Sequence, residues 1–158
     1  MTLSLLAKCG ELLVALDATQ VFQIHASADL PARQMETNLW SIELDRQTIP
    51  GWDLGQLFSY GQSTKAWVLV DAKFGGATRR FGLRVDHCVT VRKLPTVRPL
   101  PSKLYTARPG ALAGAFSTEG IDELAGTPTG VLVDLAKLLA PAELEAGGRI
   151  ARDHGGRE

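Results

Sequence analysis

Arg79-Arg80-Phe81-Gly82-Leu83-Arg84-Val85-Asp86-His87-Cys88-Val89-Thr90-Val91-Arg92-Lys93-Leu94 is the stretch of sequence that decides the fold. The odd-numbered positions from 81 to 91 are apolar, apart from His87, and the positions between them are mostly polar. Successive side chains of a β-strand point to opposite faces, so the pattern predicts one long strand, or a strand bent once, with one buried face. Burying its five apolar side chains would contribute at most about 10 kcal/mol. That figure matches the net stability of a typical domain.

The segments around this stretch predict further strands and turns. Trp67–Ala72 is expected to be a strand that enters the central one through a glycine turn at 75–76. Residues 39–44 and 48–49 predict a hairpin that turns at 45–47, and residues 12–16 and 21–24 predict another, followed by a loop over 27–38. Prolines make 95–114 an extended connector, with a short strand at 112–116.

One local pattern occurs twice. Asp53-Leu54-Gly55-Gln56-Leu57-Phe58 and Asp134-Leu135-Ala136-Lys137-Leu138-Leu139 both place leucines at helical spacing behind an aspartate, and each follows a β-rich run. An aspartate at this position can cap the first turn of a helix. Two copies of a strand leading into a capped turn suggest two similar β subdomains, and the short strands with glycine turns favour a barrel architecture.

Length and composition fit one globular domain, or two small subdomains that share one core. The chain has 158 residues, 45% of them hydrophobic and 22% charged, with 17 basic and 17 acidic residues. The balanced charge favours neither nucleic acid nor an anionic membrane as partner. Cys9 and Cys88 fit no zinc or disulfide spacing, and no signal peptide or transmembrane run is evident, so a cytoplasmic protein is expected. We expect one domain over 1–140 and a C-terminal tail over 141–158 that is partly helical or disordered.

The central stretch resembles a known family. Gly82-Leu83-Arg84-Val85-Asp86, with Val89, Val91 and Leu94-Pro95, is similar to the GLxVDxVxxVxxLP pattern of CheW-like chemotaxis adaptor domains. The resemblance covers about 11–139. It implies a mainly β fold of two intertwined five-stranded SH3-like β-barrel subdomains with short helices. It also implies a non-catalytic scaffold without cofactors that couples methyl-accepting chemoreceptors to a CheA-type histidine kinase. In this family the kinase binds one subdomain and the receptor tip binds the groove between the two.

The resemblance also suggests partner-binding residues and one departure. Family members read N-L-R-G before the Ile-Pro pair, whereas this chain has Glu43-Leu44-Asp45-Arg46 before Ile49-Pro50. Asp45 reverses the family's positive charge and Arg46 replaces its glycine, so altered partner binding is expected. Trp52, beside the Pro50-Gly51 turn, is expected to be partly exposed. The residues that we expect at partner surfaces are Leu44, Asp45, Arg46, Ile49, Trp52, Val85 and Asp86.

Two other functions are open from the sequence. The stretch 79–108 is locally basic, which makes a nucleic-acid-binding small β-barrel the alternative to the adaptor, although stacking aromatics are scarce. Asp86-His87-Cys88 contains residue types used in catalysis and metal binding. On one strand the histidine would point away from the other two, so the three cannot converge on one ion or substrate. No catalytic constellation, metal site or cofactor site is expected.

Overall fold

The computed structural model describes residues 3–59, 62, 64–94, 97–99, 111–121, 124, 126 and 129–155, with side chains described up to residue 151. Its strands form two six-stranded sheets. Sheet A has the order β10 (Val97–Arg98), β11 (Leu112–Ser117), β12 (Thr129–Val133), β2 (Leu12–Asp17), β1 (Leu3–Cys9) and β9 (His87–Lys93). Sheet B has the order β3 (Val21–Ala26), β7 (Ala66–Phe74), β8 (Ala77–Val85), β6 (Gln47–Asp53), β5 (Leu39–Leu44) and β4 (Ala32–Glu36).

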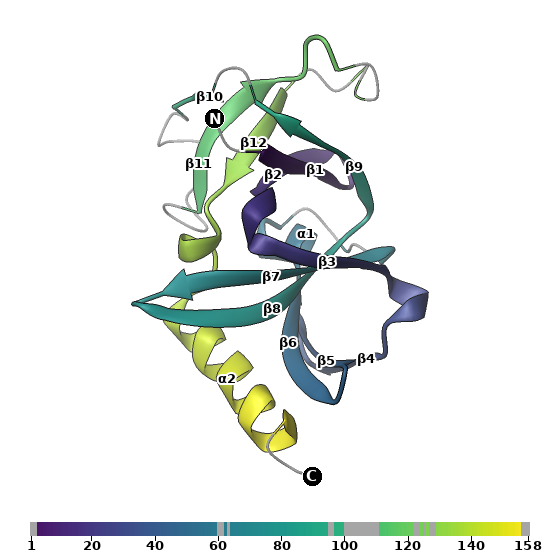
Figure 1. The fold of residues 1–158 in the computed structure, drawn as a ribbon, viewed down its shortest axis with the longest axis vertical. Helices are drawn as coiled ribbons and strands as arrows, with labels where there is room; N and C mark the ends of the chain where they lie inside the picture. Colours follow the sequence, from purple (N-terminus) through teal and green to yellow (C-terminus); the bar gives the residue numbers. More distant parts are fainter. Residues whose placement is uncertain are drawn as a thin grey trace.

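In the part of the chain that the structure describes, helices are few and mostly short. The described ones are α1 (Leu54–Leu57), α2 (Pro141–Gly155) and the 3-10 turns Ala18–Gln20, Ser27–Asp29 and Leu135–Lys137. Each sheet curls around its own interior, one above the other (Figure 1). The predicted mainly β class is therefore confirmed. Among the described helices, none combines the length and apolar character that crossing a membrane requires.

The two sheets are interlocked, because the chain starts in sheet A, builds all of sheet B and then returns to sheet A. The two strand orders correspond position by position when the hairpin β1–β2 is matched to β7–β8. The parallel pair β6–β8 then corresponds to the parallel pair β12–β2. Sheet A is thus a circularly permuted copy of sheet B. The hairpin β7–β8 comes last in sheet B, whereas its counterpart in sheet A, β1–β2, is formed by the N-terminal residues. This arrangement explains the repeated sequence pattern: β6 leads into α1, and β12 leads into the 3-10 turn 135–137.

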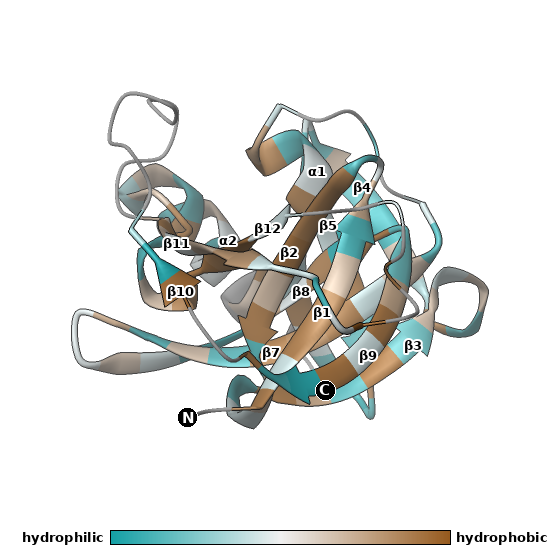
Figure 2. Cartoon of the chain, turned by 90° about the horizontal axis from the view of Figure 1, so that it is seen from above, coloured by the Kyte–Doolittle hydropathy of each residue, from teal (hydrophilic) through white to brown (hydrophobic). Residues whose placement is uncertain are grey.

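Three apolar clusters form the core. Sheet B encloses one around Trp40, Ile42 and Trp67, and sheet A encloses another around Leu13 and Phe116. The largest lies between the sheets and receives side chains from both central hairpins. Strand β2 contributes to two clusters, since alternate residues face the interior of sheet A and the space between the sheets. This double burial accounts for its nearly continuous apolar sequence, which Figure 2 shows as a largely brown strand.

The central stretch is bent once, at Asp86. Strand β8 ends at Val85 in sheet B, and β9 begins at His87 in sheet A. Phe81, Leu83 and Val85 are buried between the sheets as predicted. The alternation does not continue past the bend, because β9 is an edge strand that pairs only with β1 among the described strands. Val91 is 50% exposed, so the prediction that it is buried is wrong.

The predicted N-terminal hairpin is also wrong. β2 pairs with β1 and β12, whereas β3 crosses into sheet B and pairs with β7. The 3-10 turn 18–20, capped by Asp17, carries the chain from one sheet to the other. The segment 27–38 is not a continuous loop, because it contains β4. This strand lies at an edge with four of its five residues exposed, so it lacks the apolar alternation that reveals a strand in the sequence. With β4 and the two-residue β10, each sheet has six strands instead of the expected five.

The C-terminal segment forms a longer helix than the helical turn expected at 142–146. α2 runs from Pro141 to Gly155, including the part that we expected to fray, and lies beside sheet B (Figure 1). Its buried Ile150 joins the cluster between the sheets. A side chain at Gly147 would meet the Trp52 ring at 2.6 Å, so the glycine allows the helix backbone to approach β6 closely. The sequence did not predict this helix, because two consecutive glycines lower its helix propensity and its C-terminal end is polar.

Candidate functional site

An apolar groove lies between the free edges of the two sheets. We call it the inter-sheet groove; its volume is about 340 Å³. Strand β3 forms the edge of sheet B and β9 forms the edge of sheet A. Ile24 on β3 is 46% exposed and Val91 on β9 is 50% exposed, and the two side chains line the same groove. The groove is lined by Leu5, Ala18, Val21, Phe22, Gln23, Ile24 and Val91.

Phe22, which lines this groove, packs against the side chain of Arg80. The Arg80 guanidinium lies 4.1 Å from the centre of the Phe22 ring and donates hydrogen bonds to both carboxylate oxygens of Asp71, at 2.9 and 3.0 Å. The hydrogen bond to Asp71 raises the pKa of Arg80 above its usual value, so the charge is fixed. Arg80, on β8, therefore stabilises the position of the Phe22 ring, and its charge is paired with Asp71 and not free in the groove.

The family resemblance alone predicts a groove between the two subdomains. The local patterns predict a hairpin that includes residues 21–24 and a buried Val91. An apolar side chain on an unprotected edge strand gives the same sequence pattern as one in the core. Only the pairing of β3 with β7, and of β9 with β1, distinguishes the two cases.

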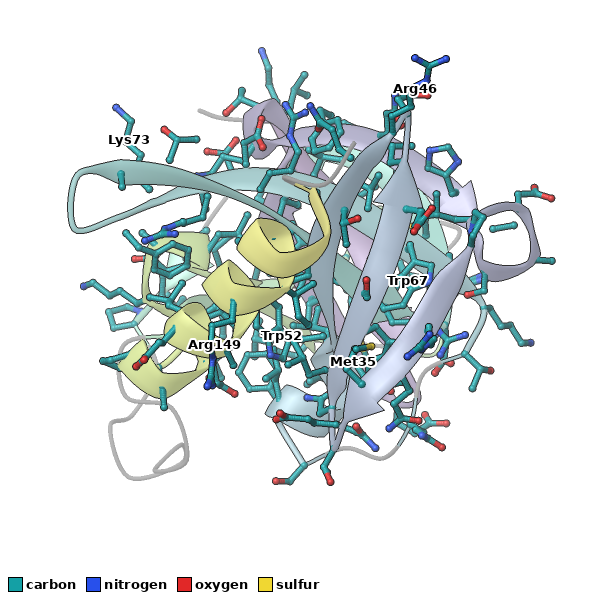
Figure 3. All side chains as sticks on the ribbon, turned by 90° about the horizontal axis from the view of Figure 1, so that it is seen from below. Met35, Arg46, Trp52, Trp67, Lys73 and Arg149 are labelled. Carbon is teal, nitrogen blue, oxygen red and sulfur yellow. The ribbon has the colours of Figure 1, made fainter. Side chains whose placement is uncertain are left out.

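The turn between β5 and β6 carries Asp45 and Arg46, both exposed, with Leu44 half-buried beside them. Leu44 pairs with Gln47, so the predicted hairpin is present, but its turn consists of Asp45 and Arg46 alone instead of the expected 45–47. Their φ angles are 49° and 67°. Positive φ at both central positions is the geometry that favours Asn-Gly, and an arginine is strained there. Figure 3 shows the Arg46 side chain at the tip of this hairpin.

We expect Arg46→Gly to stabilise the chain. Glycine adopts this backbone conformation without the clash that an L side chain makes, which should add about 1 kcal/mol and raise the Tm by about 2–4 °C. Thermal unfolding followed by circular dichroism measures the change. Arg33→Gly on the exposed edge strand β4 is the control, because glycine in a strand should lower the Tm. A lower Tm for Arg46→Gly would mean that the Arg46 side chain makes a stabilising contact.

Three of the expected partner residues are buried. Trp52 is 3% exposed, so the prediction that it is partly exposed is wrong; α2 covers it, and its ring packs edge-on against Phe81 with centroids 5.8 Å apart. Ile49 lies in the interior cluster of sheet B and Val85 between the sheets. None of the three side chains is available for direct contact with a partner in this structure.

Asp86 has a structural position at the bend between the two sheets. Its carboxylate accepts hydrogen bonds from the backbone amides of Gly10, at 2.6 Å, and Thr64, at 3.3 Å. Its own amide donates to the Lys8 carbonyl at 2.9 Å. Gly10 belongs to the β1–β2 turn of sheet A, and Thr64 precedes β7 of sheet B. Asp86 therefore fastens the two sheets together where the chain crosses between them.

The neighbours of Asp86 do not join it in a reactive site. His87 is exposed, and Cys88 packs against the cluster between the sheets. Burial raises the pKa of the Cys88 thiol above its usual value, which keeps it protonated and a poor nucleophile at neutral pH. Among the described residues, no group of three or more His, Cys, Asp or Glu side chains could hold a metal ion.

The basic stretch 79–108 is distributed over several surfaces. Arg80 pairs with Asp71, and Arg84 lies 5.5 Å from the Trp40 ring and 5.2 Å from the Trp67 ring. The described cations beyond the bend lie on β9 and β10, at opposite edges of sheet A. Lys103 and Arg108 fall outside the described residues. The described part of the stretch therefore forms no continuous basic stripe of the kind that binds single-stranded nucleic acid.

Comparisons with known proteins identify the fold. No family model and no curated protein matches the sequence. Among solved structures, the chain is similar to the scaffolding protein CheW from Thermoanaerobacter tengcongensis, with a TM-score of 0.67 and 18% sequence identity over 88% of each chain. At this identity the likeness establishes the fold alone. It agrees with the resemblance seen in the central stretch of the sequence.

Proposed function

We propose that this chain is a non-catalytic cytoplasmic adaptor that couples a chemoreceptor to a CheA-type histidine kinase. The observation that carries the proposal is the inter-sheet groove, which exposes Ile24 and Val91 between two interlocked barrels. The family resemblance implies that a receptor tip binds the groove between the two subdomains, and a helix that lays its apolar face in a groove is a common recognition mode. The solved protein that shares the fold is itself described as a scaffolding protein.

The proposal assigns the kinase to a separate surface. The exposed β5–β6 turn is the part of the chain that aligns with the family's N-L-R-G segment. The opposite charge of Asp45 and the strained Arg46 imply a kinase whose surface differs from that met by other family members. Co-purification of the full-length chain with the receptor and kinase from its own genome tests the proposal. Binding of neither protein would overturn it.

Charged substitutions in the groove should separate receptor binding from folding. We expect Ile24→Glu and Val91→Glu each to weaken receptor binding at least about tenfold, because a carboxylate would be desolvated against apolar side chains. Both positions are exposed, so the Tm should stay within about 2 °C. Val97→Glu is the matched control, since Val97 is 42% exposed but lies on β10 at the opposite edge of sheet A. Equal weakening by all three variants would place the receptor elsewhere.

A further inference from the structure

A second groove lies on another face of the molecule, where β6 and β8 separate beneath α2. We call it the α2 groove; its volume is about 360 Å³. The parallel ladder between β6 and β8 covers only Gly51↔Gly82, Trp52↔Leu83 and Asp53↔Arg84. Upstream of these pairs the two strands face each other without pairing. The groove is lined by residues 47–50, Trp52, 78–81, Leu139, Leu144, Gly147, Gly148 and Ala151.

The ladder ends where it does for a local reason. Leu44 and Gln47 flank a two-residue turn and form a hydrogen-bonded pair, so hydrogen-bonded and non-bonded pairs alternate from there along β5 and β6. Ser41↔Pro50 is consequently a non-bonded pair, and the backbone groups of residue 50 face β8. Proline has no amide proton to donate. Because Pro50 lacks this donor, the hydrogen bond that would extend the β6–β8 ladder beyond Gly51 cannot form.

Strand β8 consequently presents a free edge to the groove. Phe74 and Ala77 flank the Gly75-Gly76 turn, so the same alternation along β7 and β8 directs the backbone groups of Thr78 and Arg80 away from β7. Gly82 and Arg84 point the same way and are used by β6. Thr78 and Arg80 supply two amide donors and two carbonyl acceptors that none of the described strands uses. An extended peptide can pair with such an edge.

Side chains give the groove its chemical character. Leu144, which is half-buried, and Ala151, which is exposed, supply accessible apolar surface from α2, whereas Trp52 and Phe81 line the groove with only 3% and 1% of their surface exposed. Arg79 shares the face of Phe81 on β8 and is exposed. Unlike Arg80, it makes no ion pair with any side chain that the structure describes. Figure 3 shows Arg149 on α2 near Trp52 and Lys73 toward the tip of the β7–β8 hairpin, so two further cations lie on this side of the molecule.

We propose that the α2 groove binds an extended segment of a partner protein that carries a carboxylate beside alternating apolar side chains. The segment would add to the edge of β8 at Thr78 and Arg80, place apolar side chains against Leu144 and Ala151 of α2, and direct its carboxylate to Arg79. This inference is independent of the receptor and kinase assignments, because it uses neither the inter-sheet groove nor the β5–β6 turn.

Selection from a phage-displayed random-peptide library on the full-length chain tests the proposal. Enriched peptides should alternate apolar residues and contain Asp or Glu at one position. An enriched peptide, labelled with a fluorophore, should bind about tenfold more weakly to Arg79→Glu and to Gly148→Leu, which fills the groove. Replacing the peptide's carboxylate by lysine should restore binding to Arg79→Glu. Arg33→Glu on β4, an exposed charge change away from the groove, should leave the affinity unchanged.

Amide spectra locate the bound peptide independently of the variants. The Thr78 and Arg80 amide resonances should shift and exchange more slowly with solvent when the peptide is added. Failure to enrich any peptide, or equal binding to the wild type, Arg79→Glu and Gly148→Leu, would overturn the proposal. In that case the free edge of β8 binds no partner, and the charges of Arg79 and Arg80 serve to prevent pairing with other chains.

Discussion

Val85→Asp should unfold the chain at room temperature. Val85 is fully buried in the cluster between the two sheets, on the strand that links them. The substitution removes an apolar contribution of about 2 kcal/mol and places a carboxylate where no described basic side chain is buried beside it. The combined loss of more than about 5 kcal/mol equals the whole stability of many domains. Circular dichroism and chemical denaturation measure it.

Val91→Asp is the matched comparison within the same sequence pattern. Val91 falls on the same alternating positions as Val85, but half of its surface is exposed after the bend at Asp86. We expect this variant to melt within about 2 °C of the wild type. Unfolding of both variants would show that the buried face continues through Asp86. A wild-type Tm for Val85→Asp would mean that the opposite face of β8 is the buried one.

The features that the sequence predicted are those set by neighbouring residues. The β5–β6 hairpin, the glycine turn before β8 and the aspartate caps at 53 and 134 each depend on a few adjacent positions. The two-barrel fold was indicated by the repeated pattern of a strand and a capped turn, and by the family resemblance of the central stretch. Local chemistry and that resemblance together were sufficient to predict the fold class.

The features that the sequence did not predict depend on contacts between distant segments. Strand β3 pairs with β7, whose residues lie more than forty positions later in the sequence; His25, for example, pairs with Trp67. No local sequence pattern could reveal this pairing. The burial of Trp52 depends on α2, whose glycines lower its helix propensity. For the candidate site, the sequence correctly placed Asp45 and Arg46 on an exposed turn. It missed Ile24 and Val91, because edge exposure follows from sheet order and not from hydropathy.

Asp53→Ala is expected to cost about 2–3 kcal/mol of stability, the second-largest effect. Asp53 is fully buried, and its carboxylate accepts hydrogen bonds from the amides of Gly55, at 2.9 Å, and Gln56, at 3.4 Å, at the start of α1. Alanine would leave the buried Gly55 amide without this acceptor, which costs more than losing a solvated cap. Urea denaturation should show a lower midpoint with an unchanged m-value.

The repeated sequence pattern provides the control for this prediction. Asp134 makes the equivalent bond to the Ala136 amide, at 3.0 Å, but this bond is exposed to solvent. Because water can replace its carboxylate, Asp134→Ala should cost only about 0.5–1 kcal/mol. Asp53→Asn should also lose less than Asp53→Ala, since its amide oxygen can still accept from Gly55. Equal losses of unfolding free energy in Asp53→Ala and Asp134→Ala would show that burial does not strengthen the cap. The capped turns of the two sheets would then contribute equally to stability.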